Sequence, residues 1–320
     1  MMQINQVIRD AVESISSAEV RRSILGARLR KLKGIRLSQD SGELFEERLS
    51  FPVKKAVLNE KIAGVDSGFV DKSLFVVDLV LVRSVGVVFD YKNSIVERAH
   101  YHPNFFSFPL PHLTKNALDL DEFACSKSII RLQQETKTAR EVIEKHSPKY
   151  CFLDGSIIPQ YADKPRKDSR IKEIYHSLIE SFENLFETAE KKNCALVACV
   201  EDSRASRFGA IISEQVLKGE KIAEASYLEE CFDAVLLDYF LDVGERSMLF
   251  KYTSATEAHP HPILSDFSER WRNNIFACYL KPAPLDRPLR IEFIHNEEKS
   301  LPREAEELAS VALALSSMHR

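Results

Sequence analysis

The sequence predicts a mixed α/β fold, in which helices flank a sheet that has both antiparallel and parallel strands. Segments rich in β-branched residues follow one another closely between residues 61 and 89, as in antiparallel hairpins. From residue 123 onward, helical and strand patterns alternate with short connections, which is typical of crossovers between parallel strands. Two of the strand segments carry an aspartate that is followed at once by small residues.

Composition restricts the class of protein. The chain has 320 residues with 44% hydrophobic and 29% charged residues, which is typical of a globular protein. It contains no apolar run of 18 residues and no secretory leader, so we expect no membrane segment. Its six cysteines form no C-x-x-C pair, which favours buried thiols in a reducing cytoplasm over a zinc site. The net charge of −4 argues against nonspecific coating of DNA, but not against a local grip on nucleic acid.

The first 50 residues are predicted to be a separate N-terminal helical segment. Its apolar side chains follow helical spacing; they are Ile4, Val7, Ile8, Val12 and Ile15. A basic stretch at 21–33 is either a solvated helix face or a contact surface for phosphates or an acidic partner.

Three consecutive antiparallel strands are predicted next, at 61–66, 74–82 and 85–89. The first is a short apolar strand that ends in Asp66. Residues 101–111 contain three prolines and several aromatic side chains, which predicts an irregular loop. Those aromatic side chains either pack in the core or an interface, or stack on single-stranded bases.

A helix is predicted over 123–146, and Glu135 falls on its apolar stripe. A lone carboxylate on a buried face costs several kcal/mol unless it is paired or binds a metal. Two readings follow: Glu135 is a metal ligand, or it is a rim residue paired with a nearby lysine or arginine. Glu141 is a rival by spacing.

A strand at 150–154 ends in Asp154, and a helix at 169–192 leads to another strand at 194–200. The following loop, 201–209, carries Arg204 and Arg207 before an apolar helix. Backbone amides at a helix start together with arginines favour phosphate binding, and a plain capping loop is the alternative.

The C-terminal part adds further elements around this core. We expect a helix at 226–243, a strand near 244–250, a hairpin of strands at 275–280 and 289–294, and an amphipathic helix from residue 303. The sequence has no Walker loop, no G-x-G-x-x-G and no H-E-x-x-H, which argues against an ATPase, a dinucleotide enzyme and a zinc protease.

This order of elements brings three carboxylates together. If the strand at 150–154 pairs in parallel with the strand at 61–66, Asp66 and Asp154 lie side by side, and Glu135 reaches them from the helix packed above. This is the RNase H-like arrangement. Carboxylate oxygens suit Mg²⁺ or Mn²⁺ rather than zinc, and paired ions of this kind catalyse phosphodiester hydrolysis.

Four motifs, taken in order, resemble the NurA family of prokaryotic nucleases; they are Gly64-Val65-Asp66-Ser67-Gly68, Leu153-Asp154-Gly155-Ser156, Gly244-Glu245-Arg246-Ser247-Met248-Leu249-Phe250 and Leu289-Arg290-Ile291-Glu292. The resemblance implies that 51–320 is a NurA-like nuclease domain. It implies a Mn²⁺-dependent enzyme with 5′–3′ exonuclease and single-strand endonuclease activities. It also implies a homodimer that works with a HerA-type hexameric translocase in resecting DNA ends for recombinational repair. Asp66, Glu135 and Asp154 match the family's metal-binding and catalytic carboxylates.

The chain departs from the family pattern in two places. It reaches Arg320 without the Gly-Tyr-Pro…Ala-His segment whose Tyr and His complete the family's site, and Arg204 stands in a loop where many members carry a lysine. An alternative function is therefore a NurA-like subunit with little or no catalysis, which binds DNA or the HerA-type motor. A third alternative keeps the fold but takes RNA or a branched junction as substrate.

Overall fold

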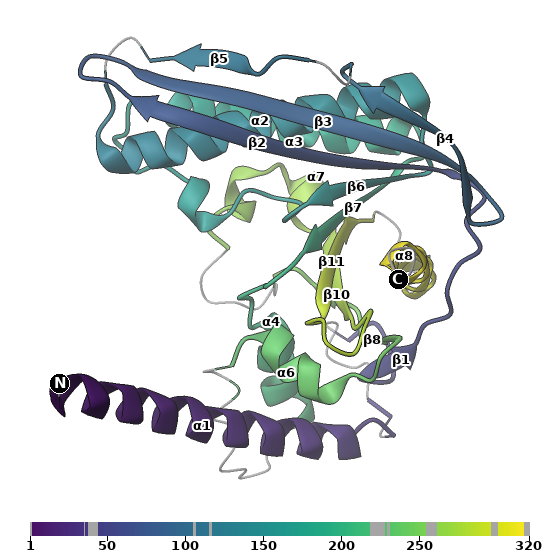
Figure 1. Cartoon of the computed structure of the whole chain (residues 1–320). Helices are drawn as coiled ribbons and strands as arrows, with labels where there is room; N and C mark the ends of the chain where they lie inside the picture. The colour runs from purple at the N-terminus through teal and green to yellow at the C-terminus, as the bar shows by residue number, and fades with distance from the viewer. Residues whose placement is uncertain are drawn as a thin grey trace.

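The structure is a computed structural model, and it describes residues 2–34, 36–37, 44–104, 107–114, 117–217, 228, 231–253, 261–295 and 300–316. Its centre is a mixed sheet that runs through the whole molecule (Figure 1). In the described part of the chain the strand order is β1-β8-β10-β11-β7-β6-β2-β3-β4, with β5 paired to β3 and β9 to β10. The mixed α/β prediction is confirmed.

Two parallel pairings in the middle of the sheet position the predicted site. Strand β6 pairs in parallel with both β2 and β7, and all other pairings are antiparallel among the described strands. The strand bounds are β1 Ser50–Pro52, β2 Lys61–Ser73, β3 Asp78–Lys92, β4 Ile95–His102, β5 Leu110–Leu113, β6 Tyr150–Asp154, β7 Ala195–Val200, β8 Glu245–Ser247, β9 Phe250–Lys251, β10 Ile275–Leu280 and β11 Leu289–Ile294.

The three antiparallel strands β2, β3 and β4 are present, but their predicted bounds were wrong. The segments 74–82 and 85–89 belong to one strand, β3, and β4 supplies the third strand at 95–102. Strand β2 does not end at Asp66 but continues to Ser73, because its ladder with β3 is unbroken. The predicted loop at 101–111 contains the end of β4 and the start of β5, while Phe105 and Phe106 lie outside the described residues.

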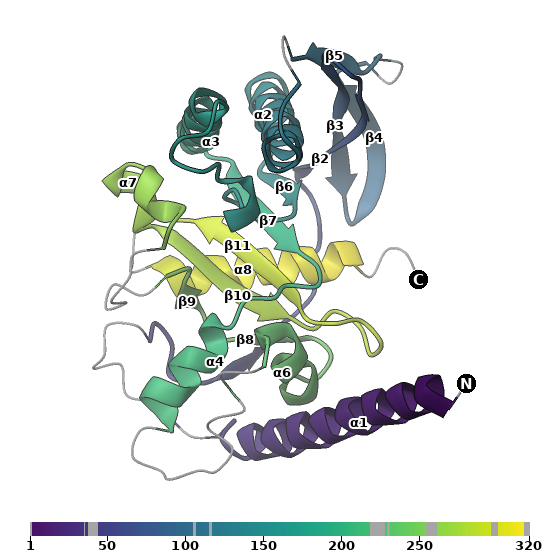
Figure 2. The same ribbon diagram turned by 90° about the vertical axis from the view of Figure 1, so that its left-hand side faces the viewer.

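Helices cover both faces of this sheet. Helices α2 and α3 pack on one face, over Ala63, Val65, Cys151 and Leu153, with the short α7 at their edge. Helix α8 packs on the other face against β10 and β11 (Figure 2). The helix bounds are α1 Met2–Lys31, α2 Leu120–His146, α3 Lys172–Lys191, α4 Arg207–Ile211, α6 Asp233–Phe240, α7 Glu269–Arg272 and α8 Leu301–Ser316, with one turn each at η1 Tyr161–Asp163, η2 Ile212–Val216 and η3 Leu264–Asp266.

A second hydrophobic cluster lies beneath the sheet, where α1, α4 and α6 pack against β10. The N-terminal helix ends at Lys31, so the helix is shorter than the predicted segment of 50 residues, whose last residue begins strand β1. Of the helix predicted at 226–243, the structure shows α6, while 226, 227, 229 and 230 lie outside the described residues.

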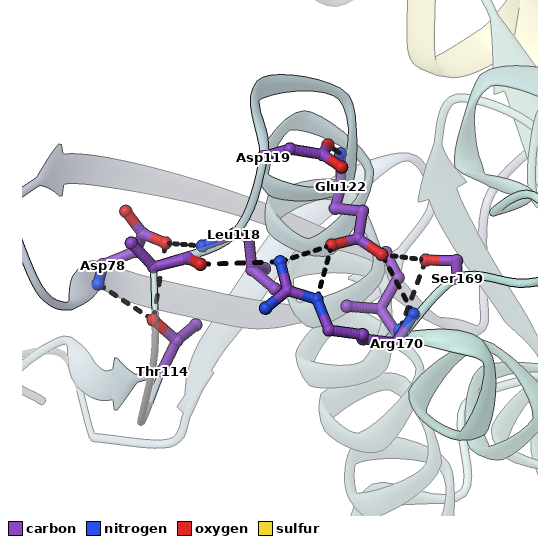
Figure 3. Close-up of polar contacts among 9 residues, drawn as sticks. Asp78, Thr114, Leu118, Asp119, Glu122, Ser169 and Arg170 are labelled. Carbon is purple, nitrogen blue, oxygen red and sulfur yellow. Dashed lines mark hydrogen bonds and ion pairs between the residues drawn. The ribbon is translucent and has the colours of Figure 1, made fainter.

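A polar network fastens the long β2–β3 hairpin to the helices (Figure 3). The buried Asp78 carboxylate accepts hydrogen bonds from Ser73 Oγ at 2.6 Å and from the Leu118 amide at 2.8 Å. These donors hold the pKa of Asp78 below its usual value. Beside it, Glu122 of α2 accepts from the side chain and the amide of Arg170, just before α3. The network fixes the start of α2 relative to both strands.

Candidate active site

Asp66 and Asp154 lie at the same level on neighbouring strands. The parallel ladder between β2 and β6 pairs Val65 with Leu153, and each aspartate is the next residue. Strand β6 ends at Asp154, where Gly155 turns the chain with a φ of +93° that an L side chain rarely adopts. Both aspartates are exposed. The predicted side-by-side placement is therefore present, although only Asp154 ends its strand.

Glu135 approaches the pair from α2. Its side chain is only 4% exposed, in agreement with its position on the apolar stripe. The pKa of Glu135 is raised to about 7, chiefly by burial and also by the charges of Asp66 and Asp154, against the lowering effects of Ser67 and Arg131. The three predicted carboxylates thus act on one another electrostatically.

Two residues that the sequence did not single out hold Glu135 in place. The Ser67 hydroxyl donates a short hydrogen bond to Glu135 Oε2, and Arg131 donates to the same oxygen at 3.0 Å. Arg131 also lies 3.3 Å from Ser67 Oγ. The ion pair of the alternative interpretation is therefore present, but Glu135 itself is buried rather than at the rim, while Arg131 is partly exposed. The i, i+4 spacing of Arg131 and Glu135 is a sequence signal that predicts this pair.

Glu141, the rival of Glu135, lies elsewhere on α2. Its carboxylate is 2.9 Å from the Nε2 atom of His102 on β4 and is partly exposed. The structure favours Glu135 over Glu141 as the third carboxylate of the site. The charges of Asp66 and Asp154 contribute to the raised pKa of Glu135, whereas Glu141 is paired with His102 at the end of β4.

The carboxylates fit a divalent cation by their chemistry, although they do not surround one point. In the described ranges, no group of three or more His, Cys, Asp or Glu side chains is arranged to hold a metal ion. Glu135 instead contacts Ser67 and Arg131. Two exposed aspartates on adjacent strands nevertheless offer the hard oxygen ligands that Mg²⁺ and Mn²⁺ prefer. Burial is the main cause of the raised pKa of Glu135, and the charges of Asp66 and Asp154 add to it.

A cleft of about 710 Å³ opens beside Asp154. It is lined by four arginines, which are Arg131, Arg204, Arg207 and Arg290. The two arginines predicted to bind nucleic acid, Arg204 and Arg207, therefore lie in the same cleft as Asp154. The cleft is also lined by four carboxylates, which are Asp154, Asp163, Asp202 and Glu292. Arg131 pairs with Glu135 and Arg290 pairs with Glu292, so Arg204 and Arg207 are the lining arginines that suit the phosphate oxygens of a ligand best.

The prediction that backbone amides at the start of the helix after loop 201–209 are available to bind phosphate was wrong. Helix α4 has one short turn, and the amides of Phe208 and Gly209 at its start donate to the Asp233 carboxylate, each at 2.9 Å. Asp233 comes from α6 and is fully buried, and burial raises its pKa to about 6. These two amides are therefore already satisfied within the protein.

A buried ion pair fixes the turn that follows Asp154. Glu292 of β11 accepts hydrogen bonds from Ser156 Oγ at 2.7 Å, from the Ile157 amide at 3.0 Å and from Arg290 Nε at 2.6 Å. The Arg290 guanidinium lies over the Tyr252 ring at 4.8 Å, which adds a cation–π contact. The Leu289–Glu292 motif thus positions Asp154.

The Gly244–Phe250 motif has a comparable role in the lower layer. Arg246 is buried and donates to Glu46 at 2.6 and 2.8 Å and to Glu306 of α8 at 3.0 Å. It joins the segment before β1 to the C-terminal helix. Of the four motifs, the first two therefore contain the candidate site, and the last two hold its surroundings.

Comparison with known proteins shows the family of the chain. The family model of the NurA domain matches residues 60–317. The NurA nuclease from Sulfolobus solfataricus has a similar fold, with a TM-score of 0.52 and 15% sequence identity over 97% of this chain and 86% of that one. A search of curated protein sequences finds no match.

Two further solved structures are more distant. NurA with manganese gives a TM-score of 0.41 at 12% identity, over 99% of this chain and 92% of that one. Endonuclease V from Ciona intestinalis, in complex with DNA, gives 0.32 at 12% identity, over 94% and 89%. Both scores are below 0.5, so the family assignment depends on the family model, and the Sulfolobus structure shows the similarity of fold. By sequence model, fold and motif placement, the chain belongs to the NurA nuclease family.

Proposed function

We propose that this protein is a Mn²⁺- or Mg²⁺-dependent deoxyribonuclease with 5′–3′ exonuclease and single-strand endonuclease activities. The observation that carries the proposal is the position of Asp66 and Asp154 on adjacent parallel strands, beside a cleft lined by arginines. Membership of the NurA family supports the reaction class.

Each group of residues has a separate task in this reaction. Asp66 and Asp154 would hold the cation, and Glu135, which pairs with Arg131 in this structure, would be the third ligand. A divalent cation there would lower the pKa of a water and stabilise the leaving oxygen. Arg204 and Arg207 balance the charge of the DNA backbone in the cleft, so that the scissile phosphate is held beside Asp154.

The decisive experiment uses 5′-labelled single-stranded and duplex DNA with Mn²⁺, Mg²⁺ or EDTA. We expect metal-dependent cleavage that falls at least a hundredfold in Asp66→Asn and Asp154→Asn, while the circular dichroism spectrum and melting temperature stay unchanged. Glu141→Gln is the matched control, since it removes a carboxylate from the same helix outside the site. Cleavage that survives in both aspartate variants contradicts this assignment.

The alternative function has one structural observation in its favour, the ion pair in which Arg131 occupies Glu135. A NurA-like subunit with little catalysis would keep that pair and bind DNA without cutting it. Absence of cleavage with every metal, together with DNA binding that is lost in Arg204→Ala/Arg207→Ala, would favour this function. The same assay on RNA and on branched junctions tests the third substrate class.

We further propose that the chain forms a homodimer and works with a HerA-type translocase in the resection of DNA ends. Family membership supports both partners. Co-elution of the purified chain with such a translocase, and faster degradation of duplex ends in its presence with ATP, are the expected results.

In the described residues, no helix is long and apolar enough to span a membrane.

A further inference from the structure

Strand β3 is apolar on both of its faces. Val80 and Val82 are at most 1% exposed and pack against Phe123 of α2. An antiparallel sheet that is covered on one face usually presents polar side chains on the other. The other face of β3 instead carries Leu81 and Val85, which are half-buried and belong to no hydrophobic cluster in the described part of the chain. Apolar surface of this kind marks a place where a ligand or a partner binds.

Leu81 and Val85 help to form a groove of about 530 Å³. Arg83 lies between them on β3, and Val70, which is 64% exposed, lines the groove from β2. Asp66, the first candidate metal ligand, lines it as well. In Figure 2, α2 and α3 lie on one side of β2 and β3, and no helix of the described chain covers the other side at this place. We call this open, largely apolar surface the β2–β3 groove.

Gly68 keeps the groove open beside Asp66. It lies two residues after Asp66 on β2, pairs with Arg83 in the ladder and lines the groove. A Cβ atom at Gly68 would meet no described heavy atom within 4 Å, and its φ lies outside the left-handed region. Neither the backbone nor the packing of the described chain therefore requires a glycine here. A glycine inside a strand often marks a site where a ligand comes close to the backbone, which agrees with the apolar floor beside it.

The β2–β3 groove and the cleft beside Asp154 meet at the two aspartates. Asp66 lines the groove, Asp154 lines the cleft, and the ladder places the two residues on neighbouring strands. A DNA strand with a phosphate at the aspartates therefore extends from the cleft into the groove. Surfaces that bind single strands combine contacts to the flat faces of the bases with cationic side chains along the backbone. The groove has both features, because apolar side chains surround the guanidinium of Arg83.

We propose that the β2–β3 groove binds an unpaired nucleobase of the substrate, in the nucleotide next to the cleaved phosphodiester, and that Arg83 contacts the backbone of the same nucleotide. The base must be unpaired, because a base inside a duplex is stacked on both faces and cannot lie on the sheet. The groove offers apolar contact rather than a pattern of donors and acceptors, so we expect little preference among the four bases. This inference rests on the proposed nuclease function for the identity of the ligand.

The first experiment measures binding without cleavage, by fluorescence anisotropy in EDTA. The probes are a labelled strand of twelve thymidines and a strand of equal length in which tetrahydrofuran sugars replace the nucleosides. We expect Gly68→Val to weaken binding of the thymidine strand at least fivefold and to leave binding of the abasic strand unchanged, because the new side chain fills the place of the base. Gly34→Val is the matched control, since it adds the same side chain at another exposed glycine with open space around it. Both variants should keep the melting temperature of the wild type.

Arg83→Gln separates the backbone contact from the base contact. It should weaken binding of both strands alike and lower the salt dependence of binding by about one phosphate contact. Thymidine binding that is unaffected by Gly68→Val, or a wild-type protein that binds both strands equally, overturns the groove as a base site. A wild-type protein that binds neither strand contradicts the nuclease function as well.

A second experiment locates the base relative to the cleaved bond. Single-stranded DNA with one abasic residue at successive positions is cut in Mn²⁺, and the rate at each bond is compared with the rate in the unmodified strand. We expect the wild type to cut at least fivefold more slowly at a bond next to the abasic residue, and Gly68→Val to show no such difference. A wild-type protein that cuts the modified and unmodified strands equally at every bond overturns this inference and leaves the nuclease function intact.

Discussion

Removal of the Glu292 carboxylate provides the sharpest test of how the protein holds Asp154. In Glu292→Ala, the guanidinium of Arg290 stays buried without its carboxylate, and the Ile157 amide loses its acceptor. Breaking a buried ion pair in this way costs about 3–5 kcal/mol of unfolding free energy. The double variant Arg290→Met/Glu292→Leu removes the unpaired charge as well. It leaves chiefly an unsatisfied amide, which costs about 1–3 kcal/mol.

Urea unfolding measures both values, with the fluorescence of Trp271, the chain's single tryptophan, and with circular dichroism. The double variant should be more stable than Glu292→Ala. It should also cleave DNA more slowly than the wild type, because the turn after Asp154 loses its acceptor for Ser156. A double variant as unstable as Glu292→Ala, or a Glu292→Ala protein as stable as the wild type, refutes the idea that an unpaired buried charge dominates.

Three further predictions follow from single contacts. Because the pKa of Glu135 in the folded protein, about 7, is above its usual 4.5, the folded state binds the extra proton and its stability falls as pH rises between these values. Between pH 4.5 and 7 in EDTA, the unfolding free energy of Glu135→Gln should therefore rise by up to about 3 kcal/mol relative to that of the wild type. A difference in unfolding free energy that does not change with pH contradicts this. Gly26→Ala should lose about 1–3 kcal/mol, measured by urea unfolding, because its Cβ would lie 2.3 Å from Tyr239 Cβ. Asp78→Ala should speed amide hydrogen exchange in the β2–β3 hairpin and leave α8 unchanged, since it removes the acceptor for Ser73 and the Leu118 amide; exchange that rises equally everywhere would mean global destabilisation instead.

The sequence by itself determined the order of elements and the main carboxylates. Helical and strand spacing are local properties, so the patterns that place Glu135 on an apolar helical stripe and Asp154 at a strand end can be read from neighbouring residues. The short connection from α2 into β6 then predicts a parallel crossover, which brings Asp154 beside Asp66. The same local patterns misplaced the division between β2, β3 and β4, because strand length is set by the partner strand and not by the strand's own residues.

Only the tertiary structure decided what surrounds these carboxylates. Ser67 bonds to Glu135, which is 68 positions away in the sequence, and Ser156 bonds to Glu292, which is 136 positions away. Asp233 accepts hydrogen bonds from the amides at the start of α4, which the sequence analysis had expected to be available for phosphate. Contacts over such separations have no periodicity in the sequence, since they arise only when packed elements bring the side chains together. The exposure of the apolar side chains in the first half of α1 has the same cause. Their spacing is visible in the sequence, but only packing shows that Leu25 and Leu29 are covered while Ile4, Ile8 and Ile15 are exposed.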